Sequence, residues 1–190
     1  PYLFQNNMYD LWFLRSRARR IGYDLLVIED ENTESGIGRL RFAPSTDVKR
    51  TTYELEYGLT LIDFAPELST HNQVGKVKLD SWDSLNKTPI SVSVSRQEIK
   101  TRGVGADGGQ AEIDKAFADR EEVITDKPVT SEAEGRQFAR ETLENIAKEM
   151  VKGSGSVVGL PGLRAGCIIF LKGMGKRFSG RYFVTGTTHT

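Results

Sequence analysis

The stretch at 77–94, VKLDSWDSLNKTPISVSV, alternates apolar and polar side chains on both sides of a polar centre. That centre, SLNKT at 84–88, has the composition of a turn. The apolar positions that follow the alternation are Val77, Leu79, Ile90, Val92 and Val94. Strict alternation places one face of a strand in the core and the other in solvent, which is typical of antiparallel sheets. We therefore expect a pair of antiparallel strands here and do not expect a doubly wound parallel sheet.

Further strands are predicted on both sides of this pair. Residues 23–28 form a compact apolar run, and residues 38–42 alternate like its antiparallel partner. Residues 51–68 also alternate, with breaks at Gly58 and Pro66. Strand signals joined by glycine-rich turns then occupy 155–163, 167–171 and 181–190. Much of the chain is thus predicted to form short strands.

Residues 9–21 and 131–150 are predicted to form two main helices. The apolar residues at helical spacing in the first are Leu11, Leu14, Ala18 and Ile21. Gly22 follows them as a left-handed cap residue would. Ser131 and Glu134 form a capping box at the start of the second. Its expected buried face comprises Ala139, Thr142, Leu143, Ile146 and Met150. A weaker helix is expected at 111–122, and the fold class is α+β, dominated by antiparallel sheet.

The polar and glycine-rich segment 100–129 is the best candidate for a linker. It separates two portions, 1–99 and 130–190, each of which combines a helix with predicted strands. The chain begins with Pro1 and stops at Thr190 inside a strand-like pattern. We therefore expect it to be a piece of a longer polypeptide.

The composition excludes several classes of function. Lys plus Arg and Asp plus Glu are equal at 26 each, so no overall field attracts nucleic acid or an anionic membrane. No apolar run approaches the roughly 20 residues that span a bilayer. Cys167 is the only cysteine, and His71 and His189 are the only histidines. A cysteine zinc site, an internal disulfide and a histidine metal cage are therefore not expected, and we expect no cofactor.

Two loops match the beginning of a ligand-binding motif. GVGADGG at 103–109 fits G-x-G-x-x-G, so nucleotide binding is the alternative function. A polar segment separates it from the apolar core of the preceding strand, which favours a flexible connector instead. DENTESG at 30–36 spaces acidic groups like a calcium loop, but it lacks the glycine and the later glutamate that such a loop needs.

No catalytic arrangement is supported by spacing. Ser179, His189 and Asp126 could be imagined as a triad, but no G-x-S-x-G elbow is present. The glycines around Lys176 and Arg177 at 173–183 do not have Walker spacing, and a strand-like segment follows them where a phosphate loop would lead into a helix. This loop is predicted to be a hairpin turn, and the protein is predicted not to be an enzyme.

The arginine-rich helix at 9–21 could contact phosphates or a partner protein. We expect Arg15, Arg19 and Arg20 to share a broad face, and Trp12 adjoins the apolar stripe as a core or interface residue. Direct nucleic-acid reading would require exposed aromatic side chains beside the arginines. A charged face that meets an acidic partner subunit is favoured, and no stable nucleic-acid or membrane binding is expected.

The stretch 159–189, GLPGLRAGCIIFLKGMGKRFSGRYFVTGTTH, closely resembles the end of the phage late control protein D family. That family has a G-x-P-x-L turn, a small-residue strand, then G-x-G, F-S-G-x-Y-x-V and a histidine. The residues that carry the resemblance are Gly159, Pro161, Leu163, Gly166, Gly173, Gly175, Phe178, Ser179, Gly180, Tyr182, Val184 and His189. Segments at 9–30, 77–90 and 128–150 are similar to the family in the same order, although Ser81 stands where glycine often precedes Trp82.

The resemblance implies a structural baseplate hub with barrel-like domains and no catalytic residue to transfer. Family members are homotrimers that join the tail tube protein to the spike protein in phages or in related contractile injection systems. The expected location is the virion tail, or a prophage-encoded injection particle assembled in the bacterial cytoplasm. Residues that could line the conduit or its rim are Lys76, Lys78, Lys172, Lys176 and Arg177.

Overall fold

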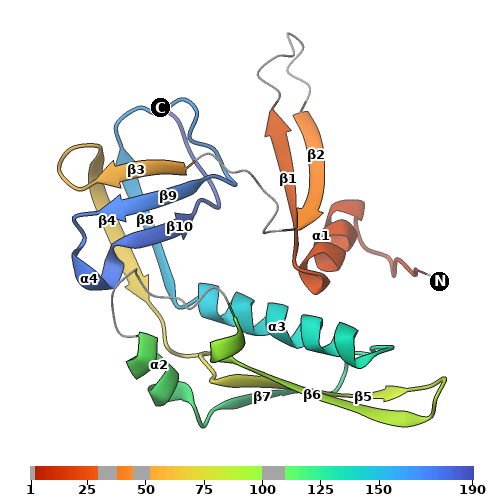
Figure 1. Ribbon diagram of the computed structural model, residues 1–190. Helices are drawn as coiled ribbons and strands as arrows, with labels where there is room; N and C mark the ends of the chain where they lie inside the picture. Colours follow the sequence, from red (N-terminus) through yellow and green to blue (C-terminus); the bar gives the residue numbers. More distant parts are fainter. Residues whose placement is uncertain (1–2, 30–37, 45–51, 100–109) are drawn as a thin grey trace. The chain divides into compact units, whose positions relative to one another are not determined.

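The computed structural model describes residues 3–29, 38–44, 52–99 and 110–190 (Figure 1). Its contacts divide the chain into two compact units, Pro1–Lys49 and Arg50–Thr190. The fold class is α+β, with two main helices and small, mostly antiparallel sheets in the described part. This confirms the fold class that the alternating segments predict.

The first unit contains a helix and a two-stranded ribbon. Helix α1 spans Asp10–Arg20, and strands β1 (Tyr23–Glu29) and β2 (Gly38–Pro44) pair antiparallel. Gly22 joins the helix to β1 with a φ of 69°, a left-handed conformation that suits glycine. The predicted helix and both predicted strands are therefore confirmed.

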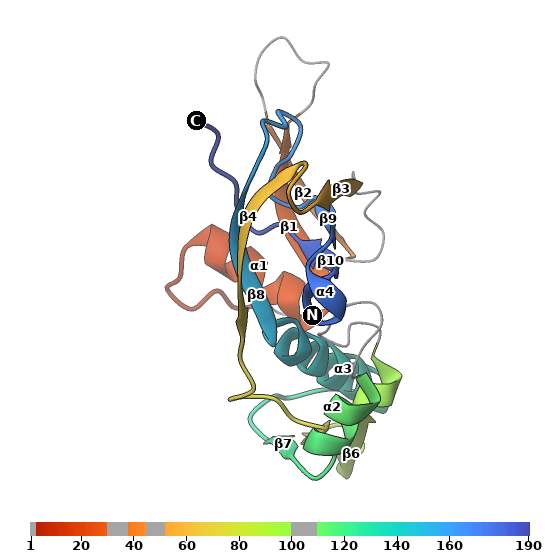
Figure 2. The same ribbon diagram turned by 90° about the vertical axis from the view of Figure 1, so that its left-hand side faces the viewer.

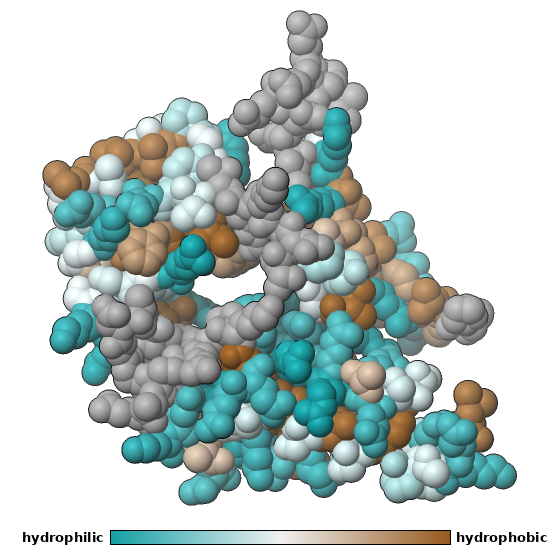
Figure 3. All heavy atoms as spheres, viewed as in Figure 1, coloured by the Kyte–Doolittle hydropathy of each residue, from teal (hydrophilic) through white to brown (hydrophobic). Residues whose placement is uncertain are grey.

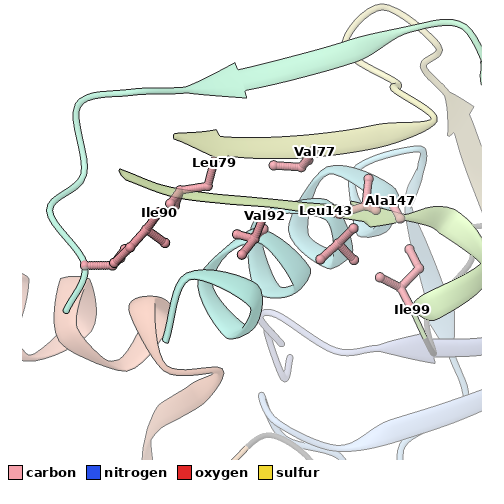
Figure 4. Packing of buried hydrophobic residues seen from close by; sticks show 10 residues of the cluster. Val77, Leu79, Ile90, Val92, Ile99, Leu143 and Ala147 are labelled. Carbon is pink, nitrogen blue, oxygen red and sulfur yellow. The ribbon is translucent and has the colours of Figure 1, made fainter. Parts of the chain in front are cut away.

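The second unit begins with a layer of one helix on one sheet. Strands β5 (Lys76–Asp83) and β6 (Thr88–Ser95) form the expected antiparallel pair, and β7 (Glu121–Ile124) lies parallel to β5 at the edge. Helix α3 (Glu132–Lys148) covers one face of this sheet. The side chains between them form the larger core, which Figure 4 shows around Val77, Val92 and Leu143. All five apolar positions of the 77–94 stretch are buried.

Helix α3 is fixed at its start by capping and then by close packing. The Ser131 side chain accepts a hydrogen bond from the Glu134 backbone N–H at 3.2 Å. The Glu134 carboxylate accepts from the backbone N–H and the hydroxyl of Thr130, each at 2.9 Å, so it caps one residue further out than a standard box. Gly135 lies against β6, where a Cβ would come within 3.2 Å of Val92.

The rest of the second unit consists of two more small sheets. Strands β3 (Thr52–Glu56), β9 (Ile168–Lys172) and β10 (Gly180–Phe183) form one, in the order β10-β9-β3. Strands β4 (Leu61–Leu68) and β8 (Val151–Val157) form the other and run side by side in Figure 2. Their shared core is small, with Leu55, Leu61 and Leu171 fully buried.

Close backbone approach explains the glycines of β8. A Cβ on Gly153 would lie 2.6 Å from the Phe64 ring, and a Cβ on Gly155 would lie 2.5 Å from the Asp63 carbonyl oxygen. The Phe64 ring therefore packs directly over the backbone of the neighbouring strand.

Pro66 lies within β4, although the sequence predicts a break there. It is tolerated because β4 pairs only with β8 among the described strands, so no second neighbour needs its missing N–H.

Two pairings differ from the purely antiparallel expectation. Strand β3 pairs parallel with β9, and β7 pairs parallel with β5. The weak helix expected at 111–122 is shorter, because α2 spans Gln110–Phe117 and the chain then enters β7. The Arg120 carbonyl accepts hydrogen bonds from the backbone N–H groups of Gly75 and Lys76 at 2.9 and 3.3 Å, so pairing with the start of β5 takes precedence over helical propensity.

The segment predicted as a linker is partly structured where it is described. Residues 110–129 include α2 and β7, and residues 100–109 lie outside the described chain. Helix α3 packs on β5 and β6, so elements from both sides of this segment share one core. The compact units meet at Lys49 and Arg50, and this division differs from the one expected at 99 and 130.

Candidate interaction surfaces

The C-terminal signature residues build a hairpin whose turn is a short helix. Strands β9 and β10 pair antiparallel, and α4 (Gly175–Phe178) connects them. Gly173, Gly175 and Gly180 have φ values of 81°, 74° and 147°, a region in which side-chain-bearing residues are strained. The hairpin predicted for this loop is confirmed, and its glycines serve backbone geometry.

The polar side chains of the same hairpin hold the turn together. The Ser179 hydroxyl accepts a hydrogen bond from the Met174 backbone N–H at 3.1 Å. The Tyr182 hydroxyl donates to the Phe178 carbonyl at 2.8 Å, and burial raises the pKa of this tyrosine. The rings of Tyr182 and Phe64 pack in a T-shaped contact with centroids 5.5 Å apart, which joins the hairpin to β4.

The imagined triad of Ser179, His189 and Asp126 has no support in the structure. The His189 ring nitrogen Nε2 lies 2.9 Å from the Leu163 carbonyl oxygen and 2.6 Å from the Arg164 guanidinium. Asp126 pairs with Lys127 at 2.8 Å, and this hydrogen bond lowers the pKa of Asp126. Each member therefore has its own structural partners, and these contacts tie the C-terminal segment to the turn at 159–163.

The lysine and arginine candidates fall into two groups. Lys76 pairs with Glu121 at 3.4 Å, Lys78 with Asp80 at 2.8 Å and Lys172 with Glu54 at 2.6 Å. The hydrogen bonds of Lys78 and Lys172 to these carboxylates raise the pKa of both lysines. Lys176 and Arg177, both exposed on α4, make no ion pair within the described structure. The charges of these two residues are therefore not neutralised by an ion pair among the described residues.

The exposed face of α1 carries Trp12, Arg15 and Arg19. Their spacing places them on one side of the helix, and the Arg15 guanidinium lies 5.9 Å from the Trp12 ring centroid. Trp12 is 59% exposed, so it does not belong to a core formed by the described residues. Of the expected apolar stripe, Ala18 is buried, whereas Leu11 and Ile21 are exposed, so the stripe prediction is wrong at those two positions. The short ribbon offers too little surface to cover them.

Two notable features carry no sequence signal that we could recognise. The first is Arg96, which is buried with only 2% of its surface exposed. Its Nε donates a hydrogen bond to the Val74 carbonyl at 2.7 Å, and its Nη2 donates to the Oε1 of Gln73. Burial lowers the pKa of this arginine. Leu85, at the tip of the β5–β6 hairpin, is 88% exposed. The alternation pattern predicts that the turn exists but not which of its side chains protrudes.

Two hollows in the described structure are open depressions. One of them, about 490 Å³, is lined by Gln5, Asn7, Met8 and Tyr9. Among the described residues no group of His, Cys, Asp and Glu could hold a metal ion. Within the same residues, no helix is both long and apolar enough to cross a membrane. The glycine-rich loop 103–109 and the acidic loop 30–36 lie outside the described residues.

The fold is shared with two tail proteins of known crystal structure. The 43 kDa tail protein of prophage MuSo2 from Shewanella oneidensis aligns with a TM-score of 0.59 and 14% identity, over 96% of this chain and 48% of its own. The tail protein of Neisseria meningitidis MC58 aligns with a TM-score of 0.62 and 11% identity, over 97% of this chain and 51% of its own. The chain therefore spans about half the length of these proteins.

One family model matches the sequence. No curated protein matches the sequence significantly. A family model described as the Alg8 N-terminal domain matches residues 1–190, the whole chain, and its name differs from that of the late control protein D family. The chain belongs to the Alg8 N-terminal domain family.

Proposed function

We propose that this chain is a structural component of a phage tail or of a phage-derived contractile injection system. The observation that carries the proposal is the fold, which it shares over 96% and 97% of its length with two tail proteins. At 14% and 11% identity this likeness concerns the fold, and the role is our inference from it. The protein then acts by assembly rather than by catalysis.

The finer part of the proposal is a baseplate hub that joins the tail tube to the spike. It is supported by the resemblance of residues 159–189 to the phage late control protein D family. The geometry of those residues fits a structural role, because Ser179 and Tyr182 bond to backbone groups of their own hairpin. We further propose a homotrimer, located in the virion tail or in an injection particle assembled in the bacterial cytoplasm.

The exposed apolar side chains fit a protein that works inside an assembly. Trp12, Val27 and Leu40 are 59%, 68% and 55% exposed and lie in the small first unit. Large apolar residues gathered at a surface are typical of interaction sites. The charges agree, since equal numbers of acidic and basic residues let copies approach without long-range repulsion.

The proposal can be tested on particles purified from the producing cells. Quantitative mass spectrometry should find this protein at a constant ratio to the tube and spike proteins, and immunogold labelling should place it at one end of the tube. A particle preparation that contains tube and spike but lacks this protein would overturn the structural role. Uniform labelling along the tube would exclude the hub.

A further inference from the structure

One face of α1 exposes apolar and positively charged side chains together. Leu11, Arg15 and Arg19 follow one another at four-residue spacing, and Trp12 lies three residues before Arg15, so they share one side of the helix. Leu11 and Trp12 are 60% and 59% exposed, and both arginines are exposed as well. This set, Leu11, Trp12, Arg15 and Arg19, is called the α1 face below. In Figure 3 hydrophobic and hydrophilic atoms are interspersed where Figure 1 draws α1.

The positive charge of the α1 face is not neutralised within the described residues. Neither Arg15 nor Arg19 forms an ion pair there. The Arg15 guanidinium lies over the Trp12 ring instead, 5.9 Å from its centroid. A cation held beside an exposed indole ring is available to a carboxylate, while the ring remains available to an apolar surface.

The described acidic side chains of the first unit do not meet the α1 face. Asp10, the acidic residue of α1 itself, lies at another position around the helix, and its Oδ1 accepts a hydrogen bond from the Gln5 Nε2 at 2.8 Å. Asp24 on β1, which packs on α1, already interacts within the chain. The side chain of Glu29 and the acidic loop 30–36 lie outside the described residues. That loop is therefore a competing occupant, which the experiment must distinguish from a partner.

The type of positive residue favours a protein as the partner. The described part of the first unit contains arginine but no lysine. Arginine is weakly hydrated and binds carboxylates through paired N–H groups, so it suits ion pairs that a protein interface buries. Tryptophan and arginine are also the residues in which protein interfaces concentrate binding energy. The composition of the α1 face is thus that of a protein-binding surface.

A nucleic acid or a membrane fits the same arrangement less well. Leu11 lies in one row with both arginines, and a phosphate backbone offers nothing apolar to cover it. Single strands stack successive bases on several aromatic rings, whereas the ring of the α1 face is that of Trp12 alone, and Arg15 lies over it. A helix bound at a membrane surface separates its apolar side from its cationic side, and here the two kinds of residue share one side.

We infer that the α1 face binds an acidic protein surface. Carboxylates of the partner pair with Arg15 and Arg19, and an apolar depression between them receives Trp12. This inference goes beyond the structural role proposed above, because it concerns the chemistry of the partner and does not depend on which particle contains the chain. Binding should weaken as salt is added, since exposed charge pairs are screened.

The purified chain can be tested with a labelled copolymer of glutamate and tyrosine, which is acidic and partly apolar. Fluorescence anisotropy at low ionic strength should show salt-sensitive binding, and polyglutamate, which lacks the aromatic groups, should bind more weakly. Binding only to a single-stranded oligonucleotide or to phosphatidylglycerol vesicles would overturn the inference. Binding to none of these probes would overturn it as well.

Substitutions assign the binding to the α1 face. Arg15→Glu and Arg19→Glu should each raise the dissociation constant for the copolymer by about tenfold or more, because each loses a charge-assisted contact. Trp12→Ala should weaken binding of the copolymer but not of polyglutamate. Arg177→Glu is the matched control, because Arg177 is exposed on α4 without an ion pair among the described residues. It should leave the dissociation constant unchanged, and a loss as large as that of Arg15→Glu would contradict a site on α1.

A crosslink tests whether the chain's own acidic loop fills the α1 face. Ser16 is exposed and lies four residues after Trp12, so a photoreactive benzophenone amino acid at position 16 reports on this face. We expect crosslinks to the copolymer and none to peptides that contain residues 30–36. Crosslinks to that loop within one chain, with none to the copolymer, would show that the face is occupied internally and would overturn the inference.

Discussion

Helix α3 with its sheet and helix α1 with its ribbon use similar elements but differ in how much they bury. Between α3 and β5–β6, residues such as Leu79, Val94 and Leu143 are 0% exposed. In the α1 unit, Ala18 alone is buried among the described residues. A two-stranded ribbon and a short helix cannot form a sufficient core by themselves. The comparison shows that the α3 region folds around its own buried contacts, whereas the α1 region leaves several large apolar side chains at the surface.

The largest effect is expected from emptying the α3 core. Leu143→Ala removes a fully buried side chain and should lower the free energy of unfolding by about 2–5 kcal/mol. Leu40→Ala in the ribbon, where the leucine is 55% exposed, should change it by less than about 0.5 kcal/mol in the monomer. Denaturant unfolding followed by circular dichroism measures both. Equal losses would show that the ribbon has a core of its own.

A smaller effect is expected at the helix starts. Ser131→Ala removes the hydroxyl that accepts from the Glu134 N–H, which should cost about 1 kcal/mol. Tyr9 precedes α1 without a side-chain cap, so Tyr9→Ala should leave stability nearly unchanged. Thermal melts of the two variants compare the helices. A loss of stability in Tyr9→Ala as large as that in Ser131→Ala would contradict the expected difference in capping between α1 and α3.

The smallest expected effect is a change in how the free energy of unfolding depends on pH, and it concerns Asp83 at the β5–β6 turn. Hydrogen bonds from Asn86 and Leu85 lower the pKa of Asp83 in the folded chain. The stability that these hydrogen bonds contribute is complete when the pH lies above about 4, the pKa of an aspartate in the unfolded chain. This stability is lost as the pH falls through the lower pKa of Asp83 in the folded chain. Asp83→Asn should therefore weaken the acid dependence of stability. The Asn86 and Leu85 amide signals in NMR titrations should shift with Asp83, and pH-independent signals would contradict this role.

The sequence predicts this fold best where the residues that alternate in the sequence are also the residues that the core buries. Val77, Val92 and Val94 alternate in the sequence and all lie in the core. The glycines at 173, 175 and 180 likewise predict a turn that local backbone geometry requires. Strand β7 could not be predicted, because its pairing depends on backbone contacts between Arg120 and the distant Gly75.

The interaction surfaces are less predictable for a physical reason. Trp12, Arg15 and Arg19 can be placed on one helix face from spacing alone, but their exposure depends on how little of α1 the ribbon covers. Leu11 and Ile21 have the spacing of core residues yet remain exposed for the same cause. Leu85 protrudes because Asp83 fixes the turn, which is a property of three-dimensional geometry.

Hydrogen exchange tests the central claim most directly, because it compares both regions in one experiment. The amides of residues 77–79, 90–94 and 139–147 should be protected in the isolated chain and in the assembled particle alike. The ribbon amides at 23–29 and 38–44 should exchange quickly in the monomer and become protected on assembly. Ribbon amides that are as strongly protected in the monomer as in the particle would contradict the account.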